Sequence, residues 1–153
     1  MALIIKKTYF IILLFLGFTL FGQSKGIDYD KKHLNLFIES MAKSKLGKTY
    51  KWGGNGPYAY DCSGFTKEVF KLSGIQIPRN SWKQAEVGKK ITKNHLKKGD
   101  LIFFNSKNHN RVDHVGIYLG HGKFIHASKF HKKIVISPFR EYRRFFKWGR
   151  RLG

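Results

Sequence analysis

The single cysteine of the 153-residue chain, Cys62, lies in the sequence YDCSGF at residues 60–65. A thiolate is a good nucleophile whereas a protonated thiol is not, and a nearby imidazole or the N-terminus of a helix lowers the pKa of a thiol. Without a second cysteine, Cys62 cannot form a disulfide within the chain. It is therefore a buried apolar side chain, an intermolecular link or a reactive group, and its surroundings must distinguish these.

Two of the seven histidines, His114 in DHVGIYLG and His126 in FIHAS, lie in segments with the residue pattern of β-strands. The stretch from Leu119 to Lys123 is typical of a hairpin connection, which would bring the second strand and its histidine back beside the first. One imidazole would then accept the thiol proton while the other fixes its tautomer. Asp113 should face the other side of the strand from His114. The other five histidines are predicted to be solvated: His33, His95, His109, His121 and His131.

Each of these residues also has a plainer interpretation. A lone cysteine on an amphipathic helix is often only a buried small side chain, and a strand histidine is often only a hydrogen-bonding group. One thiolate and two imidazoles could also hold zinc with an open position. The sequence has no Cys-x-x-Cys or His-x-x-x-His pair, so we predict no metal site and no other cofactor.

The first half of the chain is predicted to be helical on either side of a loop. Apolar residues at helical spacing predict a helix over residues 28–46. Residues 50–61, YKWGGNGPYAYD, are rich in glycine and aromatic residues and predict a structured loop of the kind that often lines sites. A second helix is expected over residues 62–73 with Asp61 or Ser63 as its cap, which places the cysteine near a helix N-terminus.

The second half of the chain predicts a small antiparallel sheet. A short helical turn within residues 80–88 precedes four aromatic or β-branched segments, which are DLIFF, VDHVGIYLG, KFIHAS and KIVIS. Helices followed by strands predict an α+β domain, with N-terminal helices packed on the sheet. The tail FREYRRFFKWGRR, residues 139–151, is assigned to a last strand with its basic residues facing water, in preference to a clamp for single-stranded nucleic acid.

The N-terminal residues predict export. Lys6 and Lys7 precede an uncharged apolar run followed by small and polar residues, which is the pattern of a secretory signal. We predict a signal peptide at residues 1–23, one mature domain over residues 24–153, and a location in the periplasm or outside the cell. A membrane anchor is the second interpretation of the apolar run. No transmembrane segment is expected in the mature chain.

The formal net charge of +21 predicts an anionic neighbour. An exported protein meets cell-wall polymers and membrane surfaces before it meets nucleic acid, so we predict the anionic cell-wall surface as a partner and no specific nucleic acid. Charge alone predicts attraction and not a reaction.

Five motifs, taken in order, resemble those of the NlpC family of bacterial cell-wall cysteine peptidases. They are YKWGGNGPYAYDCSGF, IPRNSWKQ, KKGDLIFF, DHVGIYLG and FIHAS. The resemblance covers residues 34–152, and five ordered motifs are far more specific than DCSG alone. It implies that the domain is a papain-like, NlpC-type α+β domain.

The resemblance also implies roles for individual residues. Cys62 matches the nucleophile, His114 the general base, and His126 the polar residue that orients the base. Tyr50 matches a tyrosine whose hydroxyl helps to hold the oxyanion, together with the backbone N–H of Cys62. The other matches are Asp61 and Ser63, which contact the substrate peptide, Arg79, which binds a substrate carboxylate, and Asp100, which holds a turn.

The implied reaction is hydrolysis of an amide bond in peptidoglycan stem peptides through an acyl-enzyme, with a Cys–His–His site. In this family the bond is usually the γ-D-glutamyl bond to diaminopimelate or lysine. An amidase or acyltransferase on the same scaffold is one alternative. A non-catalytic basic wall-binding domain is another, although such a domain does not need an intact cysteine and two histidines.

Overall fold

The computed structural model describes residues 30–106 and 111–153. The predicted signal peptide at residues 1–23 therefore lies outside the described residues, as does His109. The chain divides into two units, Met1–His33 and Leu34–Gly153. In the first unit, residues 30–33 are described and are helical. The second unit contains all the site residues predicted above, and within the described residues no helix is long and apolar enough to cross a membrane.

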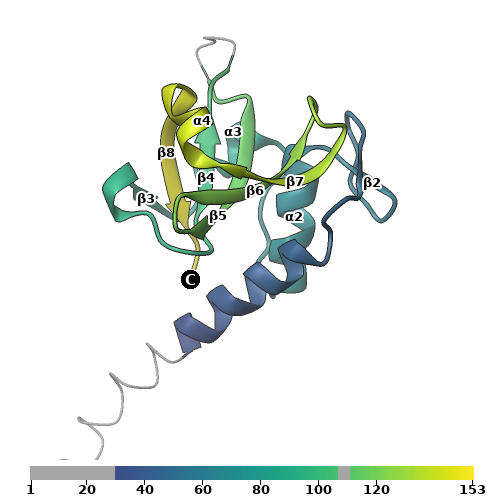
Figure 1. The fold of residues 1–153 in the computed structure, drawn as a ribbon. Coiled ribbons are helices and arrows are strands. Elements are labelled where there is room, and N and C mark those ends of the chain that lie inside the picture. Colours follow the sequence, from purple (N-terminus) through teal and green to yellow (C-terminus); the bar gives the residue numbers. More distant parts are fainter. Residues whose placement is uncertain (1–29, 107–110) are drawn as a thin grey trace, which may run out of the picture. The chain divides into compact units, whose positions relative to one another are not determined.

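The described strands form one curved sheet in the order β2-β1-β7-β6-β5-β4-β8-β3 (Figure 1). The strands are β1 (Thr49–Tyr50), β2 (Ala59–Tyr60), β3 (Lys89–Ile91), β4 (Leu101–Phe104), β5 (His114–Gly120), β6 (Lys123–Ser128), β7 (Lys133–Pro138) and β8 (Phe146–Arg151). All neighbouring strands pair antiparallel except β1 and β2, which pair parallel. The sheet is therefore mixed at one edge, which the sequence did not predict.

The predicted helices are confirmed with small changes in their bounds. They are a helix over residues 30–43, α2 (Cys62–Leu72) and α3 (Ser81–Gln84). The tail begins with α4 (Phe139–Tyr142) and a 3-10 turn (Arg143–Phe145) before it forms the predicted last strand, and another 3-10 turn spans Lys93–His95. The glycine-rich segment predicted as a loop contributes β1 and β2, which have two residues each and are too short to show an alternating pattern.

The sheet is covered on both faces by apolar side chains. On one face, α2 packs Phe65, Val69 and Phe70 against side chains of β5 and β6. On the other face, a smaller aromatic cluster contains Phe104 and Phe124. Successive residues of β4 belong alternately to the two clusters, as expected for a strand, and this explains why LIFF is apolar at every position.

The basic residues at the end of β8 differ from the prediction that they face water. Arg150 Nε donates to Ala85 O at 2.6 Å. Arg151 donates through Nε and Nη2 to the two carboxylate oxygens of Asp100, each at 2.8 Å. The reason is the position of β8 between β4 and β3, where loop carbonyls and a buried carboxylate are within reach. Asp100 also accepts from Lys97 N at 2.7 Å, so its predicted role in holding a turn is confirmed.

Candidate active site

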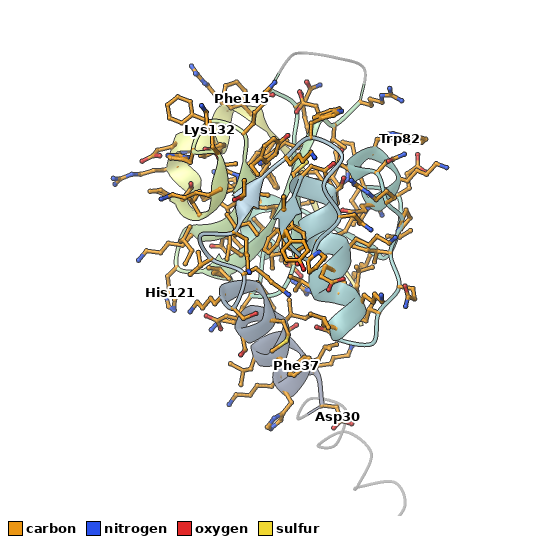
Figure 2. All side chains as sticks on the ribbon, turned by 90° about the vertical axis from the view of Figure 1, so that its right-hand side faces the viewer. Asp30, Phe37, Trp82, His121, Lys132 and Phe145 are labelled. Atoms are coloured by element: carbon orange, nitrogen blue, oxygen red, sulfur yellow. The ribbon has the colours of Figure 1, made fainter. Side chains whose placement is uncertain are left out.

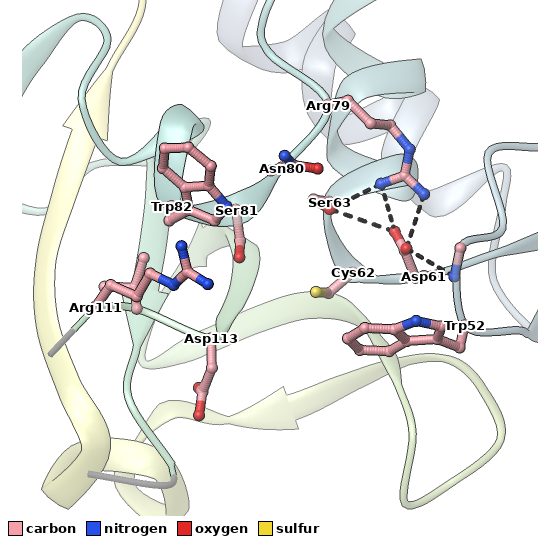
Figure 3. A pocket seen from close by; sticks show the side chains of 12 residues that line it. Trp52, Asp61, Cys62, Ser63, Arg79, Asn80, Ser81, Trp82, Arg111 and Asp113 are labelled. Atoms are coloured by element: carbon pink, nitrogen blue, oxygen red, sulfur yellow. Dashed lines mark hydrogen bonds and ion pairs between the residues drawn. The ribbon is translucent and has the colours of Figure 1, made fainter. Parts of the chain in front are cut away.

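A cleft of about 510 Å³ opens beside the N-terminus of α2 (Figure 3). Its lining includes four residues predicted from the sequence, which are Asp61, Cys62, Ser63 and Arg79. Figure 3 shows these four side chains together on one wall, with Trp82 and Arg111 on the opposite wall. The Arg111 guanidinium lies over the Trp82 ring at 5.2 Å from its centroid. The cleft therefore has a polar wall around the thiol and a cationic, aromatic wall facing it.

Cys62 is the first residue of α2, and Asp61 is its N-cap, as predicted. The Asp61 carboxylate accepts from Gly64 N at 2.7 Å. Backbone N–H groups of Val115, Ser63 and Cys62 itself point at the thiol and lower its pKa, but burial and the charge on Asp61 outweigh them and raise the pKa of Cys62 to about 11. The thiol is therefore protonated at neutral pH, and attack on a substrate requires a base.

His114 begins β5 and directly precedes Val115, whose backbone N–H approaches the thiol. The predicted hairpin between β5 and β6 is confirmed, and it brings His114 Nε2 to 2.8 Å from His126 Nδ1. The Nε2 atom of His126 lies 3.0 Å from Ser137 Oγ on β7. We call these three side chains the neutral network: His114, His126 and Ser137.

Burial keeps both imidazoles of the neutral network uncharged. It lowers the pKa of His114 to about 4 despite the nearby charge of Asp113. The pKa of His126 is also well below its usual value. Burial is the main cause, and repulsion from the protonated forms of His114 and His131 lowers it further. Since Nε2 of His114 is bonded to His126, Nδ1 is the ring nitrogen of His114 at which a further proton would be accepted.

Asp113 bonds elsewhere, in keeping with its predicted orientation. Its carboxylate accepts from Ser106 N at 3.0 Å and from Ser106 Oγ at 2.9 Å. Adjacency to His114 in the sequence thus does not make it the partner of the Nε2 atom, which bonds to His126.

Asp61, Ser63 and Arg79, predicted one by one as substrate contacts, are joined by hydrogen bonds on the cleft wall. We call these three side chains the charged network. Arg79 Nη1 donates to Asp61 Oδ1 and to Ser63 Oγ, both at 2.9 Å, and Arg79 Nη2 donates to Asp61 Oδ2 at 2.8 Å. The guanidinium predicted to bind a substrate carboxylate is thus paired with a carboxylate of the chain itself.

Two glycines allow the networks to approach the thiol. A Cβ added at Gly64 would lie 2.1 Å from Gly54 O, so the first turn of α2 packs directly on the loop before it. A Cβ at Gly116 would lie 2.7 Å from Phe124 Cδ2 and 3.2 Å from His126 Cβ. All three distances are shorter than a van der Waals contact, so a larger residue at either position would displace part of the site.

Tyr50 lies on β1 and is half-buried. Burial raises the pKa of its hydroxyl to about 12, with further contributions from the charges of Cys62 and Asp61. These contributions place the phenol in the electrostatic neighbourhood of the thiol. A phenol with this pKa is neutral at physiological pH and can donate a hydrogen bond.

Several residues of the site were missed by the sequence reasoning. Gln84 is fully buried, and its side-chain amide donates to Ser63 O at 3.0 Å and to Pro78 O at 2.7 Å, so it fixes the start of α2. Ser137 and the Trp82–Arg111 wall were also missed. A polar residue inside an otherwise apolar segment, such as the serine of KIVIS, was the available signal for Ser137.

The other described histidines are exposed, as predicted: His33, His95, His121 and His131. His121 lies at the turn between β5 and β6 (Figure 2). Across residues 30–106 and 111–153, no group of three or more His, Cys, Asp or Glu side chains is arranged to hold a metal ion.

Comparison with known proteins gives a consistent result. The model of the NlpC/P60 family matches residues 47–148. The chain is 50% identical over 86 residues to the "Probable endopeptidase p60" of Listeria innocua, covering 56% of this chain and 18% of that protein. It is 41% identical over 121 residues to the "Gamma-D-glutamyl-L-lysine dipeptidyl-peptidase" of Bacillus subtilis, covering 78% of this chain and 38% of that protein.

The structure also resembles the NlpC/p60 domain of the peptidoglycan hydrolase SagA. The TM-score is 0.69 with 30% sequence identity, over 77% of this chain and 98% of that domain. The predicted papain-like α+β fold is thereby confirmed. The chain spans less than half the length of the two relatives named above. The residues that the family model matches, 47–148, include the lining of the cleft, the thiol and both histidines. The chain belongs to the NlpC/P60 family.

Proposed function

We propose that the protein is an exported cysteine peptidase that hydrolyses the γ-D-glutamyl bond to diaminopimelate or lysine in peptidoglycan stem peptides. The observation that carries the proposal is the His114–His126 hydrogen bond of 2.8 Å at the start of β5, where the next backbone N–H, of Val115, points at the Cys62 thiol. The substrate class is supported by the names of the relatives, one of which specifies a γ-D-glutamyl-L-lysine bond.

In the proposed mechanism Cys62 is the nucleophile and His114 the general base. The thiol is protonated and the imidazole is neutral at neutral pH, since burial raises the pKa of the thiol and lowers that of the imidazole. Proton transfer from Sγ to His114 Nδ1 therefore accompanies the attack of sulfur on the substrate carbonyl. His126 accepts the Nε2–H of His114 and stabilises the imidazolium that forms.

The tetrahedral intermediate carries its negative charge on the former carbonyl oxygen. The Tyr50 hydroxyl and the backbone N–H of Cys62 are the proposed donors, and such a donor typically contributes about a hundredfold to a thousandfold in rate. The intermediate then collapses, the C–N bond breaks, and His114 returns its proton to the leaving amine. Water, activated by His114, hydrolyses the thioester and releases the acidic product.

We assign the substrate-binding role to the charged network as a unit. Asp61, Ser63 and Arg79 all line the cleft beside the thiol, so the stem peptide would lie against their hydrogen-bonded surface. The excess of Lys and Arg over Asp and Glu, which the removal of residues 1–23 would reduce by only Lys6 and Lys7, would hold the protein near an anionic wall. This attraction is not specific for nucleic acid.

The proposal is tested by incubating the protein and its Cys62→Ala variant with purified peptidoglycan and identifying the released fragments by mass spectrometry. We expect a cut after D-glutamate that falls below detection in the variant, because no other group in the cleft replaces a thiol as nucleophile. The same fragments from both samples, or a cut at another bond that depends on Cys62, would contradict the proposal.

Two histidine variants complete the test. His114→Gln should lose the cut as Cys62→Ala does, whereas His131→Gln should keep it, because His131 is exposed and its ring bonds to Ser128, outside the neutral network. Equal loss in both variants would indicate damage to the fold in place of loss of a base.

A further inference from the structure

Ser137 ends a line of three hydrogen-bonded side chains that begins at His114, the residue after Asp113 of the cleft lining, and crosses β6 to β7. Its hydroxyl is 3.0 Å from His126 Nε2, and the other ring nitrogen of His126 is 2.8 Å from His114 Nε2. His126 and Ser137 are 1% and 4% exposed. Ser137 is therefore a buried hydroxyl in direct contact with the imidazole that bonds to His114.

The surroundings of His126 leave its Nε2 atom dependent on Ser137. The imidazole stacks on the Phe124 ring at 4.6 Å between centroids, and the edge of Tyr142 approaches it at 5.3 Å. Aromatic rings thus occupy the space beside the imidazole. A buried N–H without an acceptor carries a substantial penalty, so the Ser137 oxygen matters for any state in which Nε2 is protonated.

The proposed reaction requires such a state. To accept the thiol proton on Nδ1, neutral His114 must carry its own proton on Nε2 and donate it to His126 Nδ1. His126 Nδ1 must then be unprotonated, and its single proton must be on Nε2. In the opposite arrangement His126 donates to His114, which then carries its proton on Nδ1 and cannot act as the base.

We propose that Ser137 is a positioning residue for the reaction: its hydroxyl accepts the Nε2–H of His126 and so maintains the tautomer in which His114 Nδ1 is free to take the thiol proton. This inference rests on the proposed function only for the identity of the base. Ser137 contacts neither the thiol nor the substrate; it acts through His126.

The neighbouring strand provides a matched control. Ser128 on β6 is also buried, at 2% exposure, and its Oγ lies 3.0 Å from the Nδ1 of another histidine, His131. That histidine is outside the neutral network. Ser128→Ala and Ser137→Ala therefore each remove, on adjacent strands, a hydroxyl that is bonded to a histidine ring, and Ser128→Ala also removes the bond from His131 N at 3.2 Å. Only Ser137→Ala changes the neutral network.

The first measurement uses the protein without substrate. In ¹⁵N spectra of the histidine rings at neutral pH, we expect His126 to be protonated on Nε2 and His114 also on Nε2. In Ser137→Ala this pattern should be lost or mixed with the opposite tautomer, whereas Ser128→Ala should keep it. A wild-type His126 protonated on Nδ1 would overturn the inference.

The second measurement follows the reactivity of the thiol. We expect Ser137→Ala to lower both the rate of Cys62 alkylation by iodoacetamide at neutral pH and kcat by about tenfold to a hundredfold, the range for loss of a buried acceptor. KM should change little, and Ser137→Thr, which keeps the hydroxyl, should restore most of both rates. Ser128→Ala should leave both near the wild-type values.

The outcomes separate this inference from the proposed function. Equal rates for Ser137→Ala and the wild type, or equal loss in Ser137→Ala and Ser128→Ala, would overturn the role of Ser137. The ring spectra and the alkylation rate need no peptidoglycan. A wild-type protein with the expected tautomers and no hydrolysis would therefore contradict the proposed substrate and leave the inference about Ser137 supported.

Discussion

The charged network contains Asp61 and Ser63, the chain neighbours of Cys62, whereas the neutral network begins at His114, next to the Val115 N–H that points at the thiol. The two networks handle charge in opposite ways. In the charged network the Arg79 side chain is 31% exposed and is paired with the Asp61 carboxylate. In the neutral network His126 is 1% exposed, and burial lowers the pKa of both imidazoles. In the charged network, partial solvation of Arg79 and two parallel hydrogen bonds to the buried Asp61 offset desolvation, while the groups proposed to carry protons are uncharged, with His126 buried and His114 half-buried.

This difference assigns different tasks to the two networks. The charged network is suited to hold positions, because it ties the start of α2 to the loop at Gly53 and Gly54. The neutral network is suited to move a proton, because each of its rings can accept on one nitrogen and donate on the other. Damage to the first should change geometry, and damage to the second should change the response to pH.

The largest effect is expected for Asp61→Asn. An asparagine can still cap α2, but it cannot pair with the Arg79 guanidinium or accept as strongly from Gly53 N, which lies 3.0 Å from the carboxylate. The first turn of α2 then shifts with Cys62 on it. Because a displacement of 1 Å at a reacting atom costs about a hundredfold in rate, we expect kcat/KM on a stem peptide to fall about a hundredfold.

The control is the other arginine–aspartate pair, Asp100 with Arg151. Its contacts are equally short, at 2.8 Å, and Asp100 is 1% exposed, but neither residue lines the cleft. Asp100→Asn should lower the free energy of unfolding in urea by about 3 kcal/mol, since it leaves a paired charge alone, and should leave kcat/KM near the wild-type value. If both variants lost kcat/KM equally, the charged network would have no special positional role.

The parts of the site that the sequence predicted depend on short-range patterns. The start of α2 at Cys62 and the cap at Asp61 follow from residues that are neighbours in the chain. The approach of His126 to His114 follows from a hairpin and from strand alternation. In both cases the physical cause lies within about a dozen residues.

The parts that the sequence did not predict depend on tertiary register. Arg79 and Asp61 are 18 residues apart, and nothing local distinguishes a guanidinium that pairs with its own chain from one that awaits a substrate. The Ser137–His126 contact needs the alignment of β7 on β6. The two-residue strands β1 and β2 are formed by pairing at the sheet edge, not by residue preference.

The second prediction concerns the neutral network and acid. The pKa of folded His114 is about 4 and that of His126 is also lowered, whereas a histidine in the unfolded chain has a pKa of about 6.5. As pH falls below about 6.5, the unfolded state binds more protons than the folded state, so the free energy of unfolding decreases, by up to about 1.4 kcal/mol per pH unit for each histidine.

Replacing one of the two histidines should reduce this loss. Between pH 7 and pH 4.5, His126→Gln should lose less stability in urea denaturation than the wild type, although its stability at pH 7 is lower. His131→Gln, which changes an exposed ring, should keep the wild-type slope. If the free energy of unfolding of His126→Gln fell with pH as steeply as that of the wild type, the buried imidazole of His126 would not be neutral in the folded protein.

The smallest effect is a shift in the pH profile of Cys62 alkylation. It tests how a charge in the charged network acts on the thiol. The charge of Asp61 is a cause of the raised pKa of the thiol, second to burial. Removing that charge in Asp61→Asn, while the positive Arg79 stays, must favour the thiolate and lower the pKa, so alkylation by iodoacetamide should begin at lower pH than in the wild type. Asp100→Asn should not move the profile. Asp61→Asn would then combine a more acidic thiol with slower hydrolysis, so the effect of the position of Cys62 could be distinguished from the effect of its ionisation. A profile that moved to higher pH would show that the charge of Asp61 does not act on the thiol. The role of the charged network would then be structural.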